Sequence, residues 1–158
     1  MPITVTAPRG VLTAHGEREI LPRLTAALAE ASGLTGNSFF TSAIGGTVHI
    51  LPPEDVYATG VNRPLVLVEL KLPNIGLNTI QARTAFITAA TDLVETLTVP
   101  GHDRQDIWVN ILNAPDGGWG LGGTVYTGDD LIAAVTAAAD RAPVTSCAPT
   151  QSRATPAI

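Results

Sequence analysis

The residue with the most distinctive chemistry is Pro2, which directly follows Met1. We expect the initiator methionine to be removed before this small residue, which leaves Pro2 with a free secondary amine. A free α-amino group has a pKa of about 7.7–8.0, and burial among apolar side chains lowers it by penalising the charged form. A neutral amine can act as a general base or as a nucleophile towards carbonyl groups. Pro2 is thus the first catalytic candidate, although many chains begin with Met-Pro for no chemical reason.

The other reactive side chains indicate neither a metal site nor a cofactor. Cys147 is the single cysteine, and its place near the end of the sequence argues against a catalytic role. The histidines His15, His49 and His102 lack metal-ligand spacing. We interpret His49 as a core histidine whose hydrogen bonds are satisfied.

An internal repeat organises most of the chain around Pro2. Residues 1–6 read as a strand, and residues 63–68 read as its copy. Residues 48–51 likewise match residues 109–112. Each half therefore reads strand, helix, strand.

The two helices of the repeat are predicted from capping residues and apolar spacing. Thr13 can cap the first helix, whose apolar residues recur four positions apart. Pro22 falls inside this pattern and predicts a kink, and Gly33 is a suitable end. Asn78, with Gln81 three residues later, has the pattern of a capping box for the second helix.

After the repeat, glycines surround Trp119 and lead into residues 124–127, which predicts a hairpin. Residues 129–141 read as an alanine-rich helix with an acidic start and a basic end. Residues 143–158 lack periodicity and are rich in Pro, Ser, Thr and Ala, which predicts a disordered tail.

The fold class that follows is α+β, with two tandem β-α-β units forming a two-layer domain and a C-terminal hairpin. We place this domain at residues 1–128, with halves of about 1–62 and 63–128. The C-terminal helix then covers 129–142, before the tail at 143–158.

Composition limits the function classes. The 158 residues carry a formal net charge of −5, with 45% hydrophobic and 15% charged residues, so a sizeable core is expected. The basic residues are scattered, which is unlike a nucleic-acid interface. No apolar run approaches membrane-spanning length, and no signal-peptide pattern opens the chain. We predict a cytoplasmic protein that binds neither nucleic acid nor membranes.

Taken together, the Met1-Pro2 start, the repeat and the glycine-rich run 118–123 resemble the tautomerase superfamily. The runs 48–52 and 107–110 also resemble strands of this superfamily. The resemblance covers roughly residues 1–127. Each motif is weak by itself, but their order and spacing together are specific.

The resemblance implies a cofactor-free enzyme that assembles as a homotrimer, with sites between subunits and a small-molecule substrate. It assigns Pro2 as the catalytic base and matches Asn110 to a polar site residue. Trp108 and Trp119 match positions that line the pocket in relatives. The structural alternatives are core packing or subunit burial for the two tryptophans and a strand-edge hydrogen bond for Asn110.

Cations that bind a substrate carboxylate in relatives are replaced here, since their positions hold Leu12, Trp108 and a residue near Thr41. Lys71 is our preferred substitute, although pairing with Glu69 is an alternative. We interpret Arg9 and Arg83 as surface cations.

The implied activity is keto–enol tautomerisation of a small 2-oxo acid or related carbonyl compound. Pro2 would remove a proton next to the carbonyl, and Asn110 would hold the enol oxygen. Three other reactions on the same proline-based site remain alternatives: hydration, dehalogenation and decarboxylation. Hydration needs a group that activates water, and no acidic residue stands at a matching position. A non-enzymatic trimeric binding protein is a further alternative.

Overall fold

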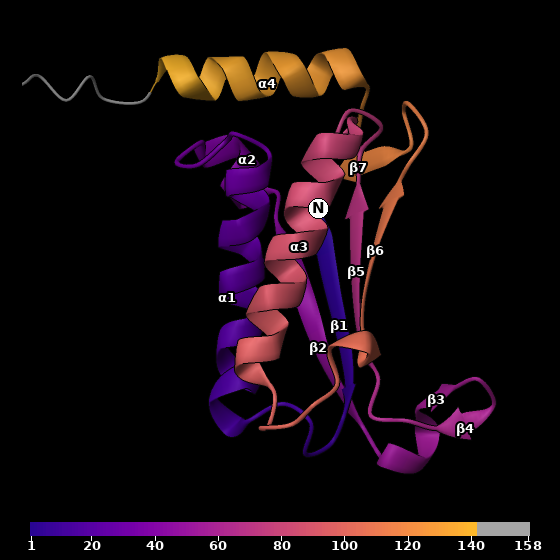
Figure 1. Cartoon of the computed structure of the whole chain (residues 1–158). Coiled ribbons are helices and arrows are strands. Elements are labelled where there is room, and N and C mark those ends of the chain that lie inside the picture. The colour runs from indigo at the N-terminus through magenta and orange to yellow at the C-terminus, as the bar shows by residue number, and fades with distance from the viewer. Residues whose placement is uncertain (142–158) are drawn as a thin grey trace, which may run out of the picture.

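Four strands with alternating apolar residues form one mixed sheet, in a computed structural model that describes residues 1–141. They are β1 (Pro2–Pro8), β2 (Gly45–Leu51), β5 (Val66–Leu72) and β6 (Ile107–Asn113). Their order is β2-β1-β5-β6. Pairing is parallel within each half and antiparallel between β1 and β5 at the centre. The predicted α+β fold with two β-α-β units is therefore confirmed (Figure 1).

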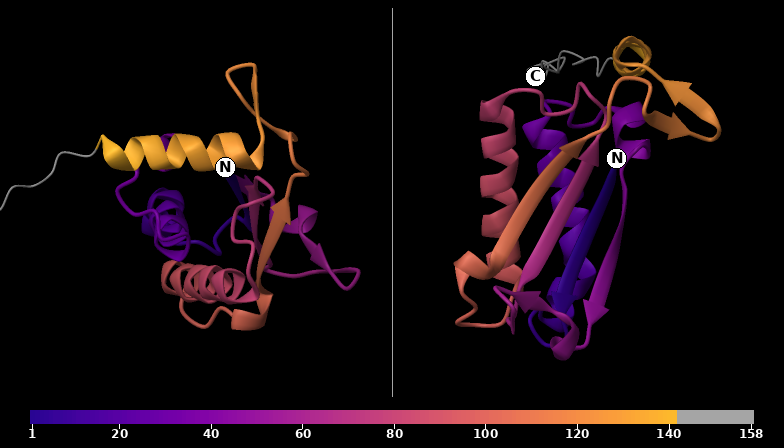
Figure 2. Two further views of the ribbon diagram at one scale, coloured as in Figure 1. Left: turned by 90° about the horizontal axis from the view of Figure 1, so that it is seen from above. Right: turned by 90° about the vertical axis from the view of Figure 1, so that its right-hand side faces the viewer.

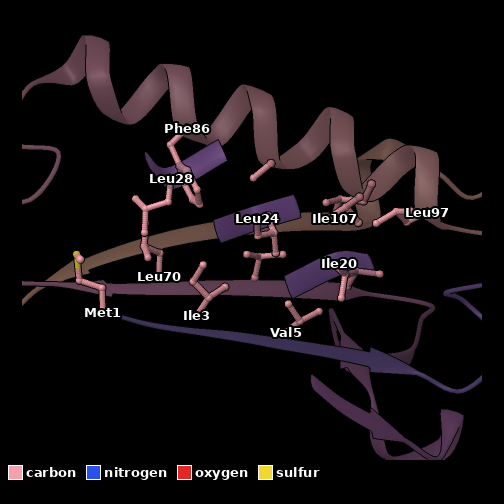
Figure 3. Close-up of a cluster of buried hydrophobic side chains, with 14 of the residues drawn as sticks. Met1, Ile3, Val5, Ile20, Leu24, Leu28, Leu70, Phe86, Leu97 and Ile107 are labelled. Carbon is pink, nitrogen blue, oxygen red and sulfur yellow. The ribbon is translucent and has the colours of Figure 1, made fainter. Parts of the chain in front are cut away.

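Two long helices, α1 (Ala14–Ala31) and α3 (Ile80–Leu97), cover one face of this sheet (Figure 1). Figure 3 shows their apolar side chains meeting those of the strands in the core. The fully buried residues include Phe86, Leu24 and Val68. Alternation along the strands explains this, because every second side chain of β1 and β5 points towards the helices.

The opposite face of the sheet carries no helix in the described part of the chain (Figure 2). Lys71, Trp108, Asn110 and Leu112 lie on it and are exposed. Both outer strands, β2 and β6, have an edge that pairs with nothing in the described residues. We call the sheet face that carries Lys71, Trp108, Asn110 and Leu112 the open sheet face.

Shorter elements complete the described chain. They are α2 (Ser38–Ser42), two single-turn 3-10 helices (Pro53–Asp55 and Arg104–Asp106), β3 (Tyr57–Ala58), β4 (Val61–Asn62), β7 (Trp119–Leu121), β8 (Thr124–Tyr126) and α4 (Gly128–Asp140). The hairpin β7–β8 and the helix α4 match the predicted elements. Helix α2 and the β3–β4 hairpin were not predicted from the sequence.

Several local predictions are corrected. Thr79, rather than Asn78, caps α3 by accepting a hydrogen bond from the Ala82 amide at 3.1 Å. His49 is exposed and bonds to Thr47 at 2.9 Å between Nε2 and Oγ1, so it is not a core residue. Alternation explains the error, since His49 falls on the open sheet face with Thr6 beside it.

Helix α1 runs uninterrupted past Pro22, and Gly33 follows its end with a φ of +65°. The tail predicted for residues 143–158, which contains Cys147, lies outside the described residues. The boundary proposed at residue 128 remains a prediction. Every helix within residues 1–141 is too short or too polar to traverse a bilayer.

Candidate active site

A cavity of about 210 Å³ lies at the end of the sheet where β1 begins. Segments far apart in the sequence enclose it: the ends of α1 and α3, helix α2, the loop after β5, strand β7 and helix α4. The described residues that line it are Met1, Ala31, Ser32, Leu34, Phe39, Phe40, Ala43, Pro73, Ile75, Gly76, Leu77, Asn78, Ala82, Trp119, Leu131 and Val135. Apart from Ser32 and Asn78, these side chains are apolar, so the cavity favours an uncharged group.

The terminal amine of the chain lies in this apolar environment. With Met1 in place, its amine donates a hydrogen bond to the carbonyl oxygen of Ala43. The Met1 carbonyl accepts from the Gly45 amide at 3.2 Å, which continues the pairing of β1 with β2. Burial lowers the pKa of this amine from 8.0 to about 6. A terminal amine at this position is therefore mostly neutral at pH 7.

The Met1 side chain is itself buried at the cavity and lies at one end of the core cluster (Figure 3). Pro2 follows it as the first residue of β1 and is exposed. Removing Met1 would leave the Pro2 nitrogen as the terminal amine, one peptide unit from the present one, about 3.8 Å along the chain. The space that Met1 occupies would then become available to a ligand.

Two side chains fix the cavity loop, residues 73–78, which joins β5 to α3. Asn113 donates from Nδ2 to the carbonyl oxygens of Pro73 and Gly76, at 2.9 and 2.8 Å. Arg83 donates to the Leu77 carbonyl at 2.9 Å and to Asn113 Oδ1 at 3.2 Å. These bonds hold Leu77 at a φ of +45°, a conformation that non-glycine residues rarely adopt. Arg83 therefore supports the loop that lines the cavity and is not a free surface cation.

The predicted site residues fall into two groups. Trp119 packs against the core and lines the cavity together with Met1. Lys71 is exposed on the open sheet face, on the strand beside Pro2, because the pairing of Ile3 with Leu70 places it next in register. Asn110 pairs with Glu69 and lies on the same face, nearer the middle of the sheet.

Trp108 is 45% exposed on the open sheet face, and its indole nitrogen donates to the Gln105 carbonyl at 3.0 Å. It lies four positions before Leu112 on β6, or about 13 Å towards the other end of the sheet. A single chain therefore does not bring Trp108 to the cavity. Arg9 also lies away from it and lines a different hollow with Arg63.

The sequence interpretation missed Leu131, Val135 and the pair Arg83–Asn113, and it considered a pocket wall for Phe39 but favoured the core or a subunit contact. Leu131 and Val135 are four positions apart, which predicts that they share one face of α4. The local sequence does not indicate which part of the chain that face packs against. Within residues 1–141, no three His, Cys, Asp or Glu side chains come together as metal ligands.

Comparison with known proteins places the fold. No family model and no curated protein matches the sequence. The chain resembles the solved structure of Pt0534 inactivated by 2-oxo-3-pentynoate, with 20% identity and a TM-score of 0.65 over 83% of this chain and 98% of that one. Native fused 4-OT matches with 20% identity and a TM-score of 0.65, over 79% and 95% of the two chains. Macrophage migration inhibitory factor of Toxoplasma gondii matches with 15% identity and a TM-score of 0.61, over 80% and 100%.

These structures are tautomerase superfamily members, so the chain has a tautomerase-like fold and the resemblance found in the sequence is confirmed at that level. At such low identity the likeness concerns the fold alone. Function depends on the residues of the site rather than on the fold.

Proposed function

We propose that the protein is a cofactor-free keto–enol tautomerase of a small 2-oxo acid or related carbonyl compound, with the processed Pro2 amine as general base. The observation that carries the proposal is the burial of the chain's terminal amine at the apolar cavity: with Met1 in place, burial lowers the pKa of the Met1 amine to about 6, and the Pro2 nitrogen lies one peptide unit further along β1. A base must be neutral before it accepts a proton, and its pKa should lie near the working pH. The Met1 amine meets both requirements, and we propose that the Pro2 amine does so once Met1 is removed.

The reaction begins when the Pro2 nitrogen takes a proton from the carbon next to the carbonyl. The electron pair of that C–H bond forms the enol double bond, and the carbonyl oxygen gains negative charge. The protonated Pro2 amine then gives the proton to the enolate oxygen, which forms the enol and restores the neutral base. A polar donor near the oxygen lowers the barrier. Asn78 lines the cavity and carries such a donor. Asn110, which the family resemblance indicates, remains our proposed donor to the enol oxygen.

We also propose that the working form is a homotrimer in which another copy covers the open sheet face. Fused 4-OT forms trimers in solved structures of this fold. The face exposes 45% of Trp108 and 49% of Leu112, and strand β6 has a free edge within the described residues. Large exposed apolar groups and free edges favour association. In this arrangement Trp108 and Asn110 would reach the site of a neighbouring copy, and Lys71 would stay beside the Pro2 of its own chain.

The test is enolisation by the correctly processed protein, with the N-terminus established by intact-mass measurement. Phenylpyruvate and 2-oxobutanoate are suitable probes, because both are 2-oxo acids with a proton next to the carbonyl. Pro2→Ala should lower kcat/KM at least a hundredfold, which is the lower end of what general acid–base catalysis contributes.

An N-terminal extension that buries the Pro2 nitrogen in a peptide bond should have the same effect. Unchanged activity in either form would remove Pro2 from the mechanism. The binding-protein alternative would be favoured by a different result: the processed protein enolises neither probe, and the extended protein still binds a partner protein. The cytoplasmic location remains a prediction.

A further inference from the structure

Helix α4 lies across the end of the molecule where the chain begins. Figure 1 shows it crossing beyond α2 and α3, and the second view in Figure 2 places the N-terminus close beneath it. Two of its residues, Leu131 and Val135, line the cavity that holds the Met1 amine. The helix therefore forms one wall of the candidate active site.

The start of α4 is fixed to the cavity loop. Asp116 Oδ1 accepts hydrogen bonds from the Gly128 amide at 2.8 Å and from Asn74 Nδ2 at 3.1 Å. Gly128 lies so close to the loop that a Cβ there would come within 2.9 Å of the Ile75 side chain. A capping box between Thr127 and Asp130 closes the first turn of the helix.

A second attachment lies further along the helix. Asn37, which is 8% exposed, caps α2 by accepting from the Phe40 amide and donates from Nδ2 to the Val135 carbonyl at 2.9 Å. This bond places the backbone at Val135 over α2, beside the phenylalanines that line the cavity. The position of Val135 is therefore fixed by a buried polar side chain as well as by apolar packing.

Helix α4 has one face buried against the cavity and another exposed. Leu131 is 6% exposed and Val135 is half-buried one turn later, so both point into the cavity. Ile132, next to Leu131, is 53% exposed. The cavity volume of about 210 Å³ exceeds the roughly 150 Å³ that holds a benzene ring in an engineered protein cavity. The volume is therefore sufficient for a phenyl-sized group.

We infer that α4 is a substrate-specificity element, with Leu131 and Val135 selecting carbonyl compounds that carry a phenyl-sized apolar group. The inference rests on the proposed function for the identity of the reacting carbonyl, but the size selection is a binding property that can be measured without turnover. The apolar group lies under α4, and the carbonyl faces the terminal amine.

The experiment measures dissociation constants of phenylpyruvate and 2-oxobutanoate for the full chain by ligand-observed NMR. The two probes share the carboxylate and the carbonyl and differ in the apolar group. We expect phenylpyruvate to bind more tightly. Val135→Phe should raise the dissociation constant of phenylpyruvate at least tenfold, which is the lower end of what one misfitting group in a pocket costs. It should change the dissociation constant of 2-oxobutanoate less than twofold.

Val135→Ala enlarges the same wall and is the second variant in case the phenylalanine disturbs folding. It should lower the dissociation constant of the larger indolepyruvate relative to that of phenylpyruvate. Ile132→Phe is the matched control, because it places the same ring on the exposed side of the same helix. It should leave both dissociation constants unchanged.

The inference is overturned if the two probes bind equally, or if folded Val135 variants leave their ratio unchanged. The proposed function fails separately if size-dependent binding is present but neither probe is enolised. Enolisation that continues with no effect of Val135 would instead reject the role of α4 and keep the function.

Discussion

Replacing Arg83 by alanine should destabilise the protein by about 2 kcal/mol, because Arg83 holds the cavity loop. Its guanidinium donates to the Leu77 carbonyl and to Asn113 Oδ1, and both bonds are partly buried. Hydrogen bonds from a charged group contribute about 1.5 kcal/mol each at the low end. Releasing the loop lets Leu77 leave its left-handed conformation, which returns roughly 1 kcal/mol.

Arg23→Ala is the matched control on the other long helix. Arg23 forms an exposed pair with Glu19, four positions earlier, at 3.7 Å. Such pairs contribute about 0.3–0.5 kcal/mol. The two substitutions remove the same side chain, so the difference isolates the attachment of the loop.

The assay is urea denaturation followed by circular dichroism at one fixed protein concentration, since association would make stability depend on concentration. Arg83→Ala should lower the free energy of unfolding by at least 1 kcal/mol more than Arg23→Ala, and should also weaken phenylpyruvate binding. Equal effects of the two substitutions would refute the account of the loop.

Three further predictions address the core, the open face and the amine. Phe86→Ala should destabilise the chain by about 3–5 kcal/mol because the ring is fully buried, whereas Ile87→Ala, at a residue 38% exposed, should cost far less in the same denaturation assay. Leu112→Arg on the open sheet face should shift sedimentation from trimer towards monomer, and Ile87→Lys on the helical side should not; a monomeric parent protein would contradict the trimer. For the amine, kcat/KM should rise with pH and level off below pH 8, because we expect burial to lower the pKa of the Pro2 amine as it lowers that of the Met1 amine, and the base works only when neutral.

The sequence predicted the repeat, the sheet and the hairpin because these depend on local patterns. Alternation of apolar residues defined the strands, and a spacing of four defined the face of α1. The N-cap of α3 was harder to predict, because Asn78 and Thr79 are both residue types that cap helices. His49 was assigned to the core although strand alternation places it on the open face.

The candidate site was predicted only in part, because its walls come together through tertiary packing. Trp119 was matched to a family motif and does line the cavity, whereas the catalytic role of Pro2 stays a prediction. The bond from Arg83 to Asn113 joins residues 30 positions apart, and the bond from Asn37 to Val135 joins residues 98 positions apart. No local pattern encodes such contacts, so Arg83 was interpreted as a surface cation.

The central claim is that the Pro2 amine is a neutral base at working pH. The most direct measurement is titration of the Pro2 nitrogen by 15N NMR in protein whose processed N-terminus has been verified by mass. We predict a pKa below the ordinary α-amine value of about 8 and equal to the kinetic pKa of kcat/KM. A nitrogen that titrates at or above that value, or apart from the kinetic pKa, would contradict the mechanism.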